Sequence, residues 1–193
     1  MKRLPGIDPD IAAVHAAKRG DAAAFSALIN QLHLRVYRFI LRQSASNQDA
    51  EDLTQETFME AHRRLSSFEE TARFSTWVLG IAQNLVRNYR NRSPQFRFNA
   101  VSTDALSTLS SSDENPEEML QKQRRMDKLR RGIEESLTPD LRQALILITL
   151  EGMDYQEAAD VLDIPVGTVK TRVFRARKAL REFLGPDSMV TVE

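Results

Sequence analysis

The residues of this sequence best suited to chemistry are cations, amides and hydroxyls that bind nucleic acid. Between Gly167 and Leu184 lie six Lys or Arg residues and one acidic residue, Glu182. Arg and Lys bind phosphate oxygens and the acceptor edge of guanine, and Thr hydroxyls contact bases or phosphates. We therefore expect a DNA-binding surface made of Thr168, Lys170, Thr171, Arg172, Phe174, Arg175, Arg177 and Lys178.

No set of residues has the spacing of a catalytic or metal site. The histidines His15, His33 and His62 are scattered, without the paired spacing of metal ligands. The sequence has no cysteine, and its seven glycines lie too far apart for a phosphate-binding loop. We therefore expect no catalytic residue, no metal site and no cofactor, and we do not expect an enzyme.

Two predicted helices would position the cationic residues. Tyr155–Leu162 is amphipathic, and after Asp163-Ile164-Pro165 a second run has apolar residues at helical spacing. This pattern predicts a helix-turn-helix unit, with Asp163 at a position that favours a positive φ. The alternative is a solvated basic surface helix, but the preceding helix and turn favour DNA binding. The apolar residues of the second run are Val166, Val169, Val173, Ala176 and Leu180.

A second polar surface is predicted on a helix over Phe74–Arg92. We expect Trp77, Ile81 and Leu85 on its buried side, with Val78 as a further candidate there and Trp77 more simply a core residue than a DNA contact. Arg binds phosphate, and Asn offers a donor and an acceptor to a base edge. A basic, solvated helix end is the alternative. The polar residues are Asn84, Arg87, Asn88 and Asn91, with Arg90 and Arg92 beside them.

An acidic helix is predicted from about Asp49 to Leu65, capped by Asn47 or Asp49. Leu53, Thr57 and Ala61 step by four and would point inward with Phe58. The acidic first half and basic second half suit the helix dipole, so a plain surface helix also explains these charges.

Composition limits the fold to small helical domains. The chain has 193 residues, 27 basic and 27 acidic, so its net charge of zero is a cancellation between acidic and basic segments. Strand signals, a signal peptide and a membrane-length apolar run are all missing, which predicts a soluble, cytoplasmic protein. We predict an all-α chain of two small helical domains joined by a flexible acidic linker. The predicted limits are 1–92 for the first domain, 93–119 for the linker, 120–185 for the second domain and 186–193 for a tail.

Four stretches, two of which overlap, resemble the extracytoplasmic-function sigma factors, a group of the bacterial sigma-70 family. YQEAADVLDIPVGTVKTRVFRARKAL looks like region 4.2, and LTPDLRQALILITLEGMDYQEAA is similar to regions 4.1 to 4.2. DAEDLTQETF resembles region 2.2, and Phe74–Arg92 resembles regions 2.3 and 2.4. The resemblance covers both predicted domains in order, roughly 21–92 and 138–184.

This resemblance implies a promoter-specificity subunit of RNA polymerase. The helix from Val166 would read the −35 element, with Lys170, Thr171, Phe174 and Arg175 at base edges and Arg172, Arg177 and Lys178 on phosphates. The −10 element would be melted by Asn84, Arg87, Asn88 and Asn91, with Arg73, Phe74, Ser75 and Thr76 as the wall of a pocket for a flipped base. Core-polymerase contacts would be Asp49, Glu51, Asp52, Gln55 and Glu56.

The implied partners are core RNA polymerase, promoter DNA and an anti-sigma factor. The polymerase would be contacted at its β′ clamp helices and β flap, and the linker would thread the RNA-exit path, although a plain solubilising linker explains its composition as well. We expect neither membrane insertion nor a homo-oligomer. The rival interpretation is a free-standing repressor or activator that binds DNA as a dimer without polymerase.

Overall fold

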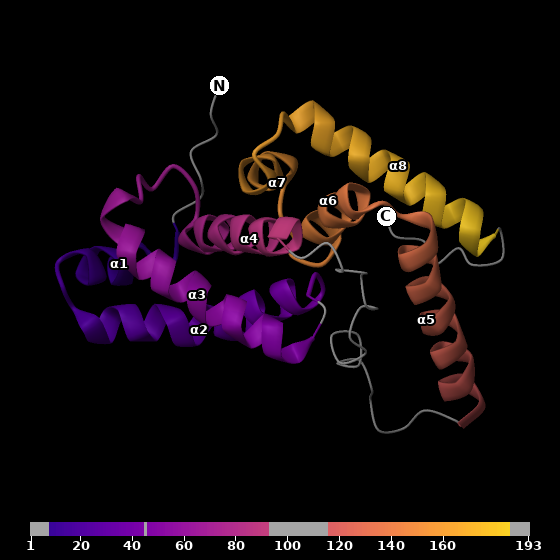
Figure 1. Cartoon of the computed structure of the whole chain (residues 1–193), viewed down its shortest axis with the longest axis horizontal. Helices are drawn as coiled ribbons and strands as arrows, with labels where there is room; N and C mark the ends of the chain where they lie inside the picture. The colour runs from indigo at the N-terminus through magenta and orange to yellow at the C-terminus, as the bar shows by residue number, and fades with distance from the viewer. Residues whose placement is uncertain (1–7, 45, 93–115, 186–193) are drawn as a thin grey trace. The chain divides into compact units, whose positions relative to one another are not determined.

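The computed structural model describes residues 8–44, 46–92 and 116–185. All regular structure in these ranges is helical, as the sequence predicted (Figure 1). The described residues divide into two compact units, which we call the N-terminal unit (8–92) and the C-terminal unit (116–185). No helix in the described ranges is both long and apolar enough to cross a bilayer.

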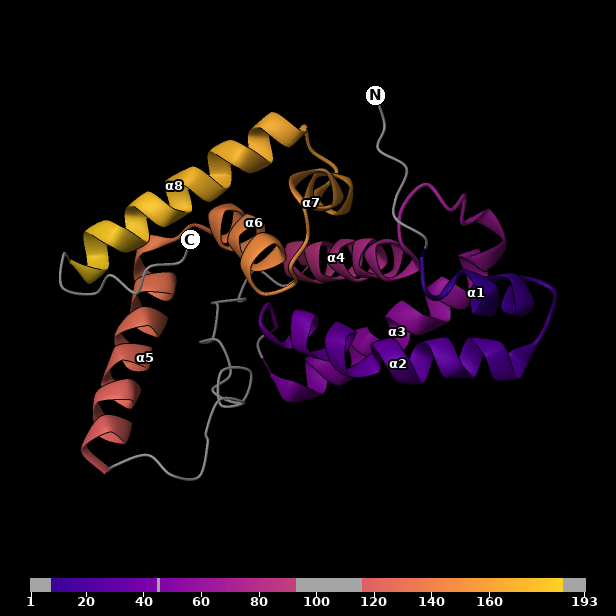
Figure 2. The same cartoon turned by 180° about the vertical axis from the view of Figure 1, so that it is seen from behind.

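The N-terminal unit is built around α2. Its elements are α1 (Ile11–Lys18), α2 (Ala22–Leu41), α3 (Asn47–Arg64), the short 3-10 helix η1 (Leu65–Ser67) and α4 (Phe74–Arg92). Figure 2 shows α3 running beside α2, and α2 also packs against α1 and α4. Leu28, Phe39 and Ile40 are fully buried in the core between these helices.

The start of α3 differs from the prediction. The N-cap is Ser46, not Asn47 or Asp49, because Ser46 has an extended backbone while the helix begins at Asn47. The Ser46 hydroxyl accepts the backbone N–H of Asp49 at 3.1 Å and donates to the Asp49 carboxylate at 2.6 Å. Asp49 therefore helps to close the first turn of the helix. The predicted inward face was right, since Leu53, Thr57, Phe58 and Ala61 are buried.

The buried face of α4 is rotated from the prediction. Val78 and Ile81 are buried as expected, and Leu79 and Val86, which were not predicted, are nearly inaccessible as well. Trp77 and Leu85 were predicted to be buried, but each is only half-buried. The cause is tertiary: α4 packs against both α2 and α3, and this double contact selects its inward side.

The C-terminal unit is built around α8. Its elements are α5 (Pro116–Ser136), α6 (Pro139–Thr149), α7 (Tyr155–Leu162) and α8 (Val166–Leu184), and α8 packs against the other three. Helix α5 begins inside the predicted linker, whose remaining residues 93–115 lie outside the described residues, as does the predicted tail.

Two cationic side chains, Arg142 and Lys128, bind carbonyl oxygens at the ends of helices in this unit. The guanidinium of buried Arg142, in α6, donates to the carbonyl oxygen of Ile133 at 3.0 Å and to that of Leu137 at 3.4 Å. The Lys128 ammonium donates to the carbonyl oxygen of Leu184 at 2.6 Å. The last carbonyls of a helix have no partner within it, so these side chains satisfy the ends of α5 and α8.

Candidate nucleic-acid and polymerase interfaces

Helices α7 and α8 form the predicted helix-turn-helix. Asp154 accepts the N–H groups of Gln156 and Glu157 at 2.7 and 2.9 Å, and Glu157 accepts the N–H of Asp154 at 3.0 Å. This reciprocal cap fixes where α7 begins. Asp163 has φ 54° and ψ 49°, so the predicted positive φ at the turn is confirmed. The turn then leads into α8, with Pro165 at the N-cap.

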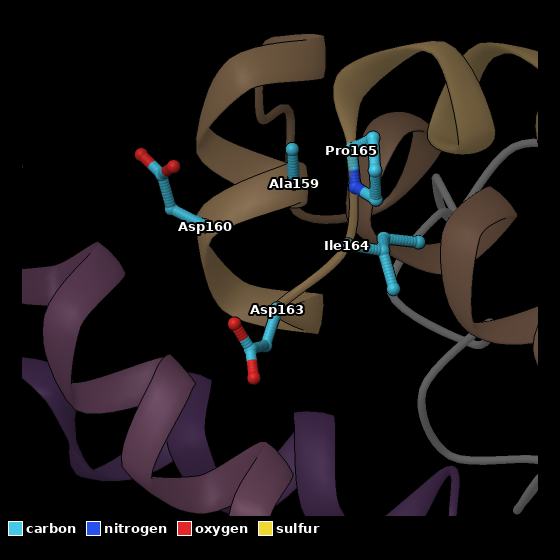
Figure 3. Close-up of a pocket in the computed structure, with 5 residues that line it drawn as sticks. All are labelled: Ala159, Asp160, Asp163, Ile164 and Pro165. Carbon is cyan, nitrogen blue, oxygen red and sulfur yellow. The ribbon is translucent and has the colours of Figure 1, made fainter.

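The turn also borders a shallow, open hollow on the surface. It is lined by Ala159, Asp160, Asp163, Ile164 and Pro165. Figure 3 shows the carboxylates of Asp160 and Asp163 pointing away from Pro165. An acidic hollow repels phosphate, so DNA is expected to approach the exposed side of α8 instead.

Helix α8 has one buried and one exposed face. Val169, Val173 and Ala176 are almost completely buried, as predicted. The opposite side exposes Lys170, Thr171, Phe174, Arg175, Arg177 and Lys178. Phe174 is 69% exposed, which is unusual for a large aromatic side chain and suits an apolar contact with a thymine methyl group.

Several of these side chains already have partners. The Arg172 guanidinium lies 2.6 Å from the Asp140 carboxylate and is half-buried, and Thr168 is half-buried as well. The Thr171 hydroxyl donates to the Gly167 carbonyl oxygen at 2.9 Å. These contacts are at the surface, where DNA can compete with them. Two more cations have weak contacts: Lys170 lies 5.9 Å from the centre of the Tyr155 ring, and Lys178 lies 3.8 Å from Glu182.

The proposed −10 residues divide into buried and accessible ones. Phe74 is 2% exposed and Thr76 is 4% exposed, so neither side chain forms the wall of an open pocket. This corrects the expectation for both residues. The physical reason is that Phe74 packs on Phe68 and Trp77, with ring centroids 5.6 and 5.7 Å away. Ser75 is half-buried, and Arg73, Asn84, Arg87, Asn88 and Asn91 are exposed.

Two of the exposed polar residues on α4 are hydrogen-bonded to each other. The Arg87 guanidinium donates to the Asn84 side-chain oxygen at 2.7 Å. This contact spans one turn and holds both side chains on the same face. The face therefore presents a cation and amides together, which is the combination that binds phosphate and base edges.

The acidic residues of α3 lie on its outer face. Glu51, Asp52, Gln55 and Glu56 are exposed, and Asp49 is half-buried. Burial, followed by a hydrogen bond to the Asp49 carboxylate and its negative charge, raises the pKa of Tyr89 above its usual value. Asp49 is thus also a contact to α4. In the described ranges no group of three His, Asp or Glu residues could hold a metal ion.

Two contacts at the start of α4 escaped the sequence analysis. Asp8 accepts the backbone N–H of Phe74 at 2.6 Å, and Lys18 contacts Glu70 at 2.8 Å. Both join segments more than 50 positions apart, as the sequence numbers show. No local sequence pattern indicates pairs of residues so far apart in the chain.

Both units match described families. Residues 28–94 match Sigma-70 region 2, and residues 135–180 match Sigma-70, region 4. The chain is 35% identical over 179 residues to the ECF RNA polymerase sigma-E factor of Salmonella typhimurium, covering 90% of this chain and 93% of the relative. It is 34% identical over 192 residues to the ECF RNA polymerase sigma factor SigE of Mycolicibacterium smegmatis, covering 98% of this chain and 73% of that one.

Solved structures share the fold. One is the sigma factor RpoE from Bartonella quintana in complex with the anti-sigma factor NepR: TM-score 0.62, 25% identity, 83% of this chain and 96% of that chain. Another is CnrH in complex with the cytosolic domain of CnrY: TM-score 0.64, 24% identity, 91% of this chain and 96% of that chain.

Proposed function

This chain belongs to the extracytoplasmic-function sigma factors of the sigma-70 family, which direct RNA polymerase to promoters, and from that premise we propose how its two units share promoter recognition. The observation that carries the proposal is the two-faced helix α8. Its apolar stripe is buried, while Lys170, Phe174 and Arg175 stand exposed at the end of a helix-turn-helix. That is the geometry of a helix lying in a major groove.

We assign the −35 element to α8. Lys170, Thr171, Phe174 and Arg175 contact base edges in this proposal, and Thr168, Arg172, Arg177 and Lys178 hold the phosphates beside them. Base contacts specify the sequence, whereas phosphate contacts fix the position of the helix on the DNA. Substitutions in the first group should therefore change sequence preference, and those in the second should weaken binding to all sequences.

The N-terminal unit opens the −10 element in this proposal. Asn84, Arg87, Asn88 and Asn91 receive the freed strand on α4, and Arg73 and Ser75 border the extruded base. Phe74 and Thr76 act from beneath, as packing residues. Opening needs no catalytic group, because stacking and cationic contacts to the freed strand offset the cost of unpairing. The chain thus contributes recognition, and the polymerase supplies the chemistry.

The acidic face of α3 is the proposed contact to core polymerase. Glu51, Asp52, Gln55 and Glu56 are exposed together and would bind the β′ clamp helices, with Asp49 at the edge. Met59 is 63% exposed one turn after Gln55, and it adds an apolar contact to this face. The C-terminal unit would bind the β flap.

Regulation by an anti-sigma factor is also proposed. The supporting observation is the likeness to a solved sigma factor bound to its anti-sigma factor. We further propose a cytoplasmic monomer that is not an enzyme. Its domains would be 1–92 and 120–185 with a linker over 93–119, of which residues 116–119 are the first turn of α5.

A gel shift tests this function against a free-standing repressor. The DNA is a promoter selected by in vitro transcription from a random library, using the chain with bacterial core polymerase. We expect weak or no binding by the chain alone and a stable complex once core polymerase is added. Tight, sequence-specific binding by the chain alone, as a dimer on two half-sites, would instead support the repressor.

A further inference from the structure

The loop before α4 is closed at its base by aromatic side chains. Phe68 and Phe74, which flank residues 69–73, have ring centroids 5.6 Å apart. Trp77 packs against both, at 5.0 Å from Phe68 and 5.7 Å from Phe74. The ends of the loop are therefore fixed by packing, and the remaining question is what orders its middle.

Helix α1 holds the middle of this loop. The Lys18 ammonium donates to the Phe68 carbonyl oxygen at 2.6 Å and to the Glu70 carboxylate at 2.8 Å. The His15 ring nitrogen lies 3.0 Å from the same carboxylate. Glu70 has φ 60°, a conformation that non-glycine residues rarely adopt without surrounding support. Lys18 and His15 supply that support.

The charge state of Glu70 favours this arrangement. The hydrogen bond from Lys18, then that from His15, holds the pKa of the Glu70 carboxyl below its ordinary value. The carboxylate is therefore ionised at neutral pH, and Lys18 balances its charge.

A third contact sets the start of α4. The Asp8 carboxylate accepts the N–H of Phe74 at 2.6 Å and that of Asp10 at 3.1 Å. An acidic group at this end is favoured by the helix dipole. The loop and the first turn of α4, which carry Arg73 and Ser75, are thus held at two points, by Lys18 of α1 and by Asp8 just before α1.

We propose that Lys18 and Glu70 are positioning residues for promoter opening: they hold the 69–73 loop so that Arg73 and Ser75 border the unpaired base of the non-template strand. This inference rests on the proposed −10 role of the same loop. A loop ordered beforehand does not have to lose conformational freedom when the base enters, so binding is tighter than with a mobile loop. Neither Lys18 nor Glu70 needs to touch DNA.

The test measures how strongly base recognition depends on this pair. Full-length chain bound to core polymerase is titrated with a single-stranded non-template oligonucleotide of the −10 element, and with copies that each lack one base. Removing the extruded base should weaken binding of the wild type about ten-fold. With Glu70→Gln or Lys18→Met, we expect weaker binding of the intact oligonucleotide and only about a two-fold further loss when that base is removed.

The control is Glu69→Gln, on the neighbouring exposed carboxylate. It removes the same charge without touching α1, and its base dependence should equal that of the wild type. Thermal unfolding of each variant accompanies the titration, and Glu70→Gln, which keeps the side-chain shape, is the milder of the two changes.

Three other results would be informative. If both variants weaken all oligonucleotides equally and retain the ten-fold base dependence, the pair is merely structural and the inference is wrong. The same conclusion follows if both behave as the wild type. If the wild type itself shows no loss with any base removed, the proposed −10 function fails, which is a different result.

Discussion

The Arg172 guanidinium of α8 lies 2.6 Å from the Asp140 carboxylate in the first turn of α6. One cation of the proposed DNA-binding face is thus held by the protein's own acid. The Asp140 side chain is 61% exposed, so the pair is near the surface and contributes little to stability. A phosphate can replace Asp140 as the partner of Arg172.

Removing this acid should strengthen DNA binding. With Asp140→Asn, Arg172 no longer has to exchange partners, and a negative charge beside the DNA is lost. We expect about two- to five-fold tighter binding of holoenzyme to matched and scrambled −35 elements alike, measured by fluorescence anisotropy at low salt. Glu135→Gln removes the same charge from α5 and serves as the control. Unchanged or weaker binding by Asp140→Asn would mean that Arg172 does not reach a phosphate.

Base and phosphate contacts on α8 should respond differently to truncation. Arg175→Ala should cost about 1–3 kcal/mol and relax the preference at one base pair, because a guanidinium can read a guanine edge. Arg177→Ala, the matched control two positions away, should weaken all sequences alike and reduce the salt dependence. Binding to a set of single-base −35 variants measures both. An equal loss on all sequences for Arg175→Ala would make Arg175 a phosphate contact.

Arg142 should stabilise the C-terminal unit alone. Replacing it by Met removes hydrogen bonds to the end of α5 and leaves buried carbonyl groups without partners, at a cost of about 2–3 kcal/mol. The single tryptophan, Trp77, lies in the N-terminal unit and reports only on that unit. We therefore expect Arg142→Met to lower the circular-dichroism transition of the C-terminal unit while the Trp77 fluorescence transition stays in place. Equal shifts of both would show that the two units unfold together.

Tyr89 should make stability fall at high pH. Its pKa is raised above the ordinary value of 10.0, first by burial and then by Asp49. An unfolded chain therefore loses this proton at lower pH than the folded chain does, so the stabilisation is complete below pH 10.0 and is lost as pH rises through the folded value. The difference in ultraviolet titration between wild type and Tyr89→Phe isolates this group. Asp49→Asn should reduce the shift only in part, and a midpoint at or below 10.0 in the wild type would contradict the account.

The elements were predictable where the signal was local. Helix α7 was predicted with its observed limits and α8 with its observed start at Val166, because apolar periodicity and the Ile-Pro turn lie within the segment itself. The positive φ of Asp163 was predicted for the same reason. The fold class followed from the absence of strand patterns.

The contacts that shape the site were not predictable in this way. Glu70 has an unusual backbone conformation because Lys18, far away in the sequence, holds it. Phe74 was predicted to line a pocket, but its ring packs on Phe68 instead. Nothing in the sequence indicated a buried Arg142. It is buried because its guanidinium donates hydrogen bonds to carbonyl oxygens at the end of α5. In each case a tertiary partner decided the outcome.

The central claim is that this chain lets core polymerase open a promoter. Permanganate reactivity of thymines across a selected −10 element measures that opening directly. The account predicts reactive thymines only when both the chain and core polymerase are present, and their loss when Glu56 and Gln55 are replaced by Lys. Unreactive thymines with both proteins present, on a promoter that the mixture binds, would contradict it.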